Sequence, residues 1–158
     1  FVEGGSVTAA TSSPFSLGAA ALLVTSKSFA KDNGLTIRAE IVSRAVTGID
    51  WTRMGMGPLP ATDKALKKAN LTLDKIEIIE LNEAFSSQSL AVIRTLGLNP
   101  EIINVNGGAI SLGHPLGCSG AKLSVQLFEE MKRRKQRYGM VTMCVGTGQG
   151  AAGIFEIL

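Results

Sequence analysis

The chain has 158 residues, of which 45% are apolar and 18% are charged, and its formal net charge is +3. This composition excludes a disordered chain and is typical of a soluble globular protein of about one domain; no run of about 18 apolar residues indicates a membrane-spanning helix. One histidine and two cysteines, without a Cys-x-x-Cys pair, argue against a metal site and a disulfide framework, so we expect a reducing compartment.

The most basic stretch of the chain is KRRKQR, residues 132–137. No aromatic residues interleave with these charges, so the stretch favours a solvated helix end over a site for single-stranded nucleic acid. We therefore expect no nucleic acid and no membrane as partners. The first residues, FVEGGSVTAA, contain neither an initiator methionine nor a signal pattern, and we expect the chain to be a fragment of a longer protein.

In the first half of the chain, short apolar runs alternate with helical patterns. Gly34 is a helix stop, and Pro60 and Thr62 mark a helix start. The predicted elements are a buried strand over residues 18–26, a helix over 27–34, a strand within 36–49 and a helix over 60–71.

The second half continues the same alternation and closes with two apolar segments around a glycine turn. The predicted elements are a strand over residues 74–82, a helix over 83–97, a strand over 101–108, a helix over 118–135 and strands over 138–146 and 150–158. The order βαβαβαβαββ, with strands that are apolar almost throughout, predicts an α/β fold whose mixed, mostly parallel sheet is covered by helices.

Functional groups in such folds gather where strands end and loops begin. Three loops that follow predicted strands carry such groups, namely Asn82, His114 and Cys144. Asn82 is interpreted either as a helix cap or as an amide that orients a water or a carbonyl oxygen. His114 is the only histidine and lies between Gly113 and Pro115, where it is either a structural residue or a group that exchanges protons with a thiol.

The two cysteines have different sequence surroundings. Cys118 lies where a helix is predicted to begin, which can lower the pKa of a thiol, but we favour a packing residue. Cys144 precedes Gly146, Gly148 and Gly150, whose exposed N–H groups suit an oxyanion, whereas the pattern matches neither fingerprint of a nucleotide-phosphate loop.

The segments NEAF, NVNGGAISLGHPLGCSGAK and CVGTGQGAA, in this order, resemble the C-terminal part of thiolases. The resemblance extends from GGSVTAATSSPF to GIFEIL and includes MGMGPLPATDKALKKA. It implies a thiolase-like fold, the second half of an αβαβα architecture with helices on both faces of the sheet. Residues 1–34 would be the tail end of the N-terminal domain, and residues 35–158 the C-terminal domain.

The resemblance also implies roles for individual residues. His114 matches the histidine that takes a proton from the nucleophilic cysteine and donates to the thioester oxygen, and Cys144 matches the cysteine that moves a proton on and off the α-carbon of the substrate. Asn82 matches the asparagine that holds a water of an oxyanion site, and the N–H of Gly146 matches part of a second oxyanion hole. A neighbouring His114 or backbone dipoles are expected to lower the pKa of Cys144.

By the same resemblance, Ser13 matches a serine that contacts the pantetheine arm of CoA, and Ala84 and Phe85 belong to the substrate and CoA site. Thr11 and Leu17 depart from the Asn and Asp that relatives commonly carry in the first loop. Cys118 aligns with a position where relatives often have Ala, which supports a packing role.

The implied activity is acyl transfer to CoA, as a Claisen condensation of two acetyl-CoA or the reverse thiolysis of a 3-ketoacyl-CoA. CoA and acetyl-CoA would be substrates, with no bound cofactor and no metal. The nucleophilic cysteine of the family lies in the N-terminal half, so we expect this chain alone to be inactive and that half to be its partner. The complete protein is expected to form dimers or tetramers in the cytoplasm, or in mitochondria or peroxisomes in a eukaryote.

Two alternatives remain open from the sequence. A standalone, non-catalytic module could bind acyl-CoA or a partner half. A ketoacyl synthase would share the fold, but that family uses a second histidine, and this chain contains only His114.

Overall fold

Four strands form one mixed sheet in a computed structural model of the chain, which describes residues 2–158. The strands are β1 (Glu40–Gly48), β2 (Ile78–Leu81), β3 (Tyr138–Val145) and β4 (Gln149–Glu156), in the order β1-β4-β3-β2. β4 pairs antiparallel with both β1 and β3, and β2 pairs parallel with β3. The sheet is mixed, as expected, but only one of its three strand pairs is parallel, so the expectation of a mostly parallel sheet is wrong.

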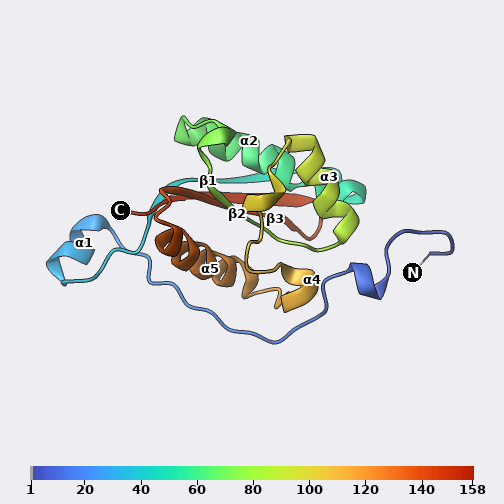
Figure 1. The fold of residues 1–158 in the computed structure, drawn as a ribbon, viewed down its shortest axis with the longest axis horizontal. Coiled ribbons are helices and arrows are strands. Elements are labelled where there is room, and N and C mark those ends of the chain that lie inside the picture. Colours follow the sequence, from blue (N-terminus) through green and yellow to red (C-terminus); the bar gives the residue numbers. More distant parts are fainter. Residues whose placement is uncertain (1) are drawn as a thin grey trace.

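Helices cover both faces of the sheet (Figure 1). One face carries α2 (Pro58–Ala69) and α3 (Ser86–Leu96), and the other carries α5 (Ser119–Arg134) and the short α4 (Ala109–Leu112). The small α1 (Lys27–Asp32) lies beside this body. Four short 3-10 segments complete the elements: Ala9–Thr11, Trp51–Met56, Leu73–Lys75 and Pro100–Ile102.

Two apolar clusters hold the helices to the sheet. Ile79, Leu81 and Met140 face α2 and α3, while Ile78 and Val141 face α5. The central strands are therefore buried on both sides, which explains why their sequences are apolar almost throughout. Burial of each such Ile or Leu side chain contributes about 1.5–3 kcal/mol to folding.

Two predicted strands are absent from the sheet. Residues 18–26 form an extended segment with no strand partner, and Leu23 and Val24 are 78% and 71% exposed. An apolar sequence becomes a buried strand only when a neighbour pairs with it, so the predicted strand is wrong for this chain. Residues 101–108 contain a 3-10 turn and a single bridge between Ile103 and Ile79, because Asn104 adopts a left-handed φ of 46° and ends the pairing.

The other predicted helices and strands are confirmed, with ends that differ by a few residues. The sequence patterns did not indicate α4, whose four residues are too few to show a helical period. No helix within residues 2–158 combines the length and the apolar character needed to cross a bilayer.

Candidate active site

Asn82 and Cys144 lie at the same edge of the sheet. β2 and β3 are parallel, so their carboxyl ends coincide, and the Asn82 N–H donates to the Thr142 carbonyl oxygen at 3.0 Å. Side chains alternate along a strand, so Thr142 and Cys144 share the face that carries α2, where Thr62 Oγ1 donates to Thr142 Oγ1 at 3.2 Å. Cys144 thus lies two residues after Thr142, the residue to which the Asn82 backbone is hydrogen-bonded.

His114 reaches this edge from the opposite layer. It lies just after Gly113, the C-cap of α4, and its N–H donates to the Pro14 carbonyl oxygen at 3.4 Å. The imidazole Nδ1 lies 2.6 Å from Ser119 Oγ, and Nε2 lies 3.5 Å from Asn82 Nδ2. The structure therefore brings together His114 and Asn82, two residues that lie 32 positions apart in the sequence.

The hydrogen bonds around His114 indicate one tautomer. Ser119 Oγ donates to the Pro115 carbonyl oxygen at 3.1 Å, so the same oxygen accepts the Nδ1–H of the imidazole. Nε2 then carries a lone pair directed at the side-chain amide of Asn82. Burial lowers the pKa of His114, which favours this neutral form at rest. A neutral imidazole with a free Nε2 is suited to accept a proton.

Ser119 is a residue of this site that the sequence reasoning did not identify. It is buried in the first turn of α5, where its hydroxyl bridges His114 and the Pro115 carbonyl oxygen. The only sequence signal is the spacing of five residues between His114 and a serine at a predicted helix start, and that spacing has many structural explanations.

Asn82 is almost fully buried, with 2% of its surface exposed. Its Oδ1 has no hydrogen-bond partner among residues 2–158, while its Nδ2 faces His114. Buried amide oxygens are usually hydrogen-bonded to protein or to ordered water. The Asn82 amide can therefore accept one further hydrogen bond from a small polar group.

Cys144 is buried near the end of β3, with 9% of its surface exposed. Burial raises the pKa of its thiol, since desolvation disfavours the thiolate more than a backbone hydrogen bond favours it. No hydrogen bond joins Cys144 to His114 within the described residues. The expectation of a lowered Cys144 pKa is therefore wrong, and the resting group is a neutral thiol.

Gly146 lies exposed in the turn between β3 and β4. Its N–H lies beyond the last residue pair of the hairpin, Val145 with Gln149, so the strand ladder does not use it. A Cβ built on Gly146 would meet no atom within 4 Å. The turn thus presents a backbone donor at the same end of β3 as Cys144.

An amino-terminal loop covers part of this edge. Ser13 donates to the Ala84 carbonyl oxygen through both its N–H, at 3.0 Å, and its hydroxyl, at 3.3 Å. Ser12 pairs with Phe85, and Phe15 pairs with His114, in isolated bridges. Ser13, Ala84 and Phe85 are thus adjacent to one another and next to the loops of Asn82 and His114.

Cys118 is the N-cap of α5 and is half-buried. Its Sγ lies close to the amino-terminal segment, because a Cβ built on Gly18 would be 3.8 Å from it. This contact is of the kind that a small packing residue makes.

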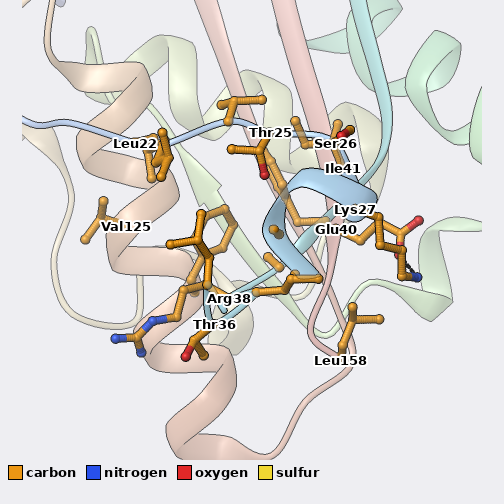
Figure 2. A pocket seen from close by; sticks show the side chains of 18 of the residues that line it. Leu22, Thr25, Ser26, Lys27, Thr36, Arg38, Glu40, Ile41, Val125 and Leu158 are labelled. Atoms are coloured by element: carbon orange, nitrogen blue, oxygen red, sulfur yellow. Dashed lines mark hydrogen bonds and ion pairs between the residues drawn. The ribbon is translucent and has the colours of Figure 1, made fainter. Parts of the chain in front are cut away.

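A cavity of about 590 Å³ lies elsewhere, between α1, α5 and the extended segment before α1 (Figure 2). Leu22, Val125 and Leu158 line it, and the ion pair of Lys27 with Glu40, at 3.2 Å, lies at its side. None of its lining residues belongs to the loops of Asn82, His114 or Cys144. Residues 2–158 contain no cluster of three or more His, Cys, Asp or Glu residues that could hold a metal ion.

Comparison with known proteins agrees with this fold. Residues 35–157 match the family model described as the C-terminal domain of thiolase. The chain belongs to the thiolase family. Curated relatives of this thiolase domain include the 3-ketoacyl-CoA thiolases of Photobacterium profundum and an Enterobacter species, which are 54% and 56% identical over 155 residues. These alignments cover 96% of the chain and 40% of each relative.

Solved thiolase structures have the same fold as this domain. The acetyl-CoA acetyltransferase of Bacillus anthracis matches with a TM-score of 0.97 and 44% identity, over 100% of the chain and 40% of that protein. Human mitochondrial 3-ketoacyl-CoA thiolase in complex with CoA matches with a TM-score of 0.90 and 40% identity, over 98% of the chain and 39% of that protein. The structural similarity confirms the predicted α/β thiolase-like fold. The chain spans about 40% of the length of these relatives.

Proposed function

We propose that this thiolase domain supplies the acid–base and oxyanion groups of an enzyme that transfers acyl groups to CoA. The reaction is the thiolysis of a 3-ketoacyl-CoA, or in reverse the condensation of two acetyl-CoA. The observation that carries the proposal is the 3.5 Å approach of Asn82 Nδ2 to His114 Nε2, at the sheet edge where Cys144 lies near the end of β3. Curated relatives are 3-ketoacyl-CoA thiolases, which supports the same reaction.

His114 is the proposed base for a nucleophilic thiol. Its neutral imidazole, with Nδ1–H bound to Ser119, takes the proton of the attacking thiol on Nε2. The imidazolium then faces the thioester oxygen and stabilises the charge that develops there. The nucleophilic cysteine belongs to the amino-terminal part of the enzyme, outside this chain.

Cys144 is the proposed proton carrier for the α-carbon of the substrate. In thiolysis, cleavage of the bond between the α- and β-carbons leaves an enolate on the departing acyl-CoA, and the neutral thiol gives its proton to that carbon. In condensation, the thiolate takes the same proton back. The raised pKa of Cys144 makes the neutral thiol the resting form, and this is the form that gives its proton to the α-carbon in thiolysis.

Two donor groups would stabilise the oxygen charges. The Asn82 amide holds a water that acts together with His114, and the free Oδ1 of Asn82 among residues 2–158 supports this role. The Gly146 N–H serves the second oxyanion. Each such donor is worth about 2.7–4 kcal/mol in the transition state.

The proposed CoA site includes Ser13, Ala84 and Phe85, which the amino-terminal loop holds beside His114. We assign residues 1–34 to the end of the preceding domain, although Phe1 lies outside the described residues. The start of the family match at residue 35 and the exposure of residues 17–24 support this assignment. The complete enzyme is proposed to be a dimer or tetramer, and because the curated relatives are bacterial, its compartment is proposed to be the cytoplasm.

Thiolysis of acetoacetyl-CoA by free CoA tests the proposal. The 158-residue chain is assayed alone and together with the amino-terminal part of the Bacillus anthracis enzyme. We expect no turnover by the chain alone and turnover by the pair, which Cys144→Ala abolishes and Cys118→Ala leaves unchanged. Turnover by the isolated chain that disappears in Cys118→Ala would make Cys118 the nucleophile, and a bound but inactive pair would favour a non-catalytic module.

A further inference from the structure

Glu83 follows Asn82 directly and connects two segments that are distant in sequence. Its Oε2 accepts a hydrogen bond from the N–H of Ile110, in the first turn of α4, at 3.1 Å. Its Oε1 accepts one from Asn104 Nδ2 at 3.0 Å. The carboxylate therefore joins the turn after β2 to the segment that leads into α4.

Asn104 is itself fastened to the end of β2. Its N–H donates to the Ile79 carbonyl oxygen at 2.9 Å. Its side-chain amide binds both backbone groups of Leu81, accepting from the N–H at 2.9 Å and donating to the carbonyl oxygen at 2.8 Å. The side-chain amide of Asn104 thus makes the hydrogen bonds to Leu81 that a neighbouring strand would otherwise make. The Glu83 carboxylate in turn accepts a hydrogen bond from that amide.

The short helix α4 connects the residue that Glu83 binds, Ile110, to His114. Gly113 N–H donates to the Ala109 carbonyl oxygen, and Leu112 N–H donates to the Gly108 carbonyl oxygen, each at 2.9 Å. These bonds leave little freedom between Ile110, which Glu83 holds, and His114, which directly follows Gly113. The position of His114 relative to Asn82 consequently depends on where Glu83 fixes the start of α4.

Gly108 lies directly against the carboxylate of Glu83. Its φ of −106° is open to any residue, so the backbone conformation does not require glycine there. A Cβ at this position would overlap Glu83 Cδ and both oxygens of its carboxylate. A side chain at position 108 would therefore have to displace the Glu83 carboxylate from its hydrogen bonds.

We infer that Glu83 is a positioning residue that sets the distance between Asn82 and His114. The contacts form a closed ring, which runs from Asn82 through Glu83, Ile110 and α4 to His114 and returns across the 3.5 Å approach to Asn82 Nδ2. Glu83 acts through these two residues, and its carboxylate is already occupied by protein donors. The inference rests on the proposed function, in which Asn82 and His114 share one oxyanion site.

Nuclear magnetic resonance of the 158-residue chain tests the inference without any need for turnover. His114 is the only histidine, so one imidazole spin system reports on the site. In the unaltered chain, we expect a nuclear Overhauser effect between its ring proton Hε1 and the side-chain amide protons of Asn82. Glu83→Ala is expected to abolish this effect, and Glu83→Gln, which keeps one acceptor oxygen, to weaken it.

Glu77→Ala is the matched control. Glu77 Oε2 also accepts two backbone hydrogen bonds, from the N–H groups of Arg137 and Tyr138 at 2.6 and 3.0 Å, but at the opposite end of β3. Its loss should destabilise the fold and leave the contact between Asn82 and His114 unchanged. An unchanged Overhauser effect in Glu83→Ala, or an equal loss in Glu77→Ala, would overturn the inference.

Gly108→Ala provides a second, independent variant. The added Cβ should displace the carboxylate and reduce the same Overhauser effect, whereas in a Glu83→Ala background it should cause no further change. Equal effects of Gly108→Ala in both backgrounds would contradict the inference. If Glu83→Ala fails to fold, Gly108→Ala in the otherwise unaltered chain still tests the inference, because it displaces the carboxylate without removing it. An unchanged Overhauser effect in Gly108→Ala would then overturn the inference.

A kinetic measurement completes the test, on the 158-residue chain mixed with the amino-terminal part of the Bacillus anthracis enzyme. A displacement of catalytic groups by about 1 Å can cost about 100-fold in rate, so Glu83→Ala should lower kcat by up to about that factor, with a much smaller change in the KM for CoA. If the unaltered pair shows no turnover, the proposed function fails, but the Overhauser measurement still decides the role of Glu83. An unchanged kcat in an active Glu83→Ala pair would contradict the role.

Discussion

The hydroxyl of Ser119 determines which imidazole nitrogen of His114 is free. The Ser119 oxygen accepts a hydrogen bond from the Nδ1–H and donates its own O–H to the Pro115 carbonyl oxygen. The lone pair of the imidazole is therefore on Nε2, beside Asn82. A serine in a helix is common. Ser119 matters here because the tertiary structure places its hydroxyl within hydrogen-bond distance of His114.

Ser119→Ala should therefore release the imidazole. We expect a mixture of both neutral tautomers in the ¹⁵N spectrum of His114, and a fall in kcat of about 10-fold for the pair with an amino-terminal half, equivalent to about 1.4 kcal/mol. Ser124→Ala is the control, because Ser124 lies in the same helix and donates to the Gly120 carbonyl oxygen at 2.8 Å. A single unchanged tautomer in Ser119→Ala would contradict the assignment.

The raised pKa of Cys144 has a measurable pH dependence. In a Cys118→Ala chain, alkylation of the remaining thiol should have its midpoint above the ordinary cysteine value of about 8.5. A thiol whose pKa is raised by folding stabilises the fold below the pKa of the unfolded chain, so its contribution is lost as the pH rises through the folded value. A midpoint below about 8.5 would show that another group offsets burial.

At the scale of elements, the contact of β2 with α5 contains a buried carboxylate. Glu80 is fully buried on the face toward α5, and Gln126 Nε2 donates to its Oε1 at 3.3 Å. Its Oε2 has no hydrogen-bond partner among residues 2–158. Burial raises the pKa of Glu80 to about 7, with Glu130 and Glu83 adding to the shift and Lys122 opposing it.

Glu80→Gln should stabilise the chain above about pH 7. The carboxylate costs stability as the pH rises from its unfolded pKa of about 4.5 to the folded value of about 7, so the amide should raise the free energy of unfolding at about pH 8 by up to about 3 kcal/mol. Urea unfolding at about pH 5 and about pH 8 measures the difference.

Glu130→Gln, in the helix α5 that packs against Glu80, is the control for Glu80→Gln. Hydrogen bonds from Arg133, with further bonds from Asn106 and Arg134, lower the pKa of Glu130 to about 2. Its removal should therefore destabilise the chain at both pH values. A Glu80→Gln chain that is less stable than the parent at the higher pH would contradict the argument.

The crossing of α2 over β4 depends on two glycines. A Cβ on Gly150 would overlap the carbonyl oxygen, carbonyl carbon and Cα of Gly57, which are all backbone atoms and cannot move aside as a side chain can. Gly150→Ala should lower the free energy of unfolding by about 3 kcal/mol, the upper part of the range for overpacking. Gly48→Ala, where a Cβ would meet no atom within 4 Å, should change it far less. Equal effects of the two substitutions in thermal unfolding would contradict the close approach.

At the scale of the whole molecule, the amino-terminal segment leaves apolar surface uncovered. Phe15 is 93% exposed, Leu17 is fully exposed, and Leu23 is 78% exposed. In Figure 1 the blue segment runs along the outside of the layer that contains α4 and α5 before it reaches α1. Exposed apolar patches of this kind mark interaction surfaces.

The 158-residue chain should therefore bind the dye ANS, and an amino-terminal thiolase half should suppress this fluorescence when it covers the segment. A chain of residues 35–158 is the control, because it lacks the segment and should bind less dye from the outset. Equal dye binding by the full chain with and without the amino-terminal half would show that the segment is not the contact surface.

A strand predicted from the sequence is present in the structure only where a neighbouring strand pairs with it. Residues 138–146 and 150–158 were recognisable as strands because both are apolar and a glycine turn joins them. Residues 18–26 are equally apolar but have no neighbour to pair with, and residues 101–108 are interrupted at Asn104. Local composition indicates that a segment can be a strand, and pairing decides whether it becomes one.

The same distinction applies to the site. The sequence by itself indicated the family and singled out Asn82, His114 and Cys144, because the segments NEAF, NVNGGAISLGHPLGCSGAK and CVGTGQGAA occur in the order that resembles thiolases. Only the tertiary structure decided that His114 meets Asn82 and Ser119, that Glu83 anchors α4, and that burial raises the pKa of Cys144. The physical reason is that hydrogen bonds and desolvation depend on which groups meet in space, and chain order does not specify those distances.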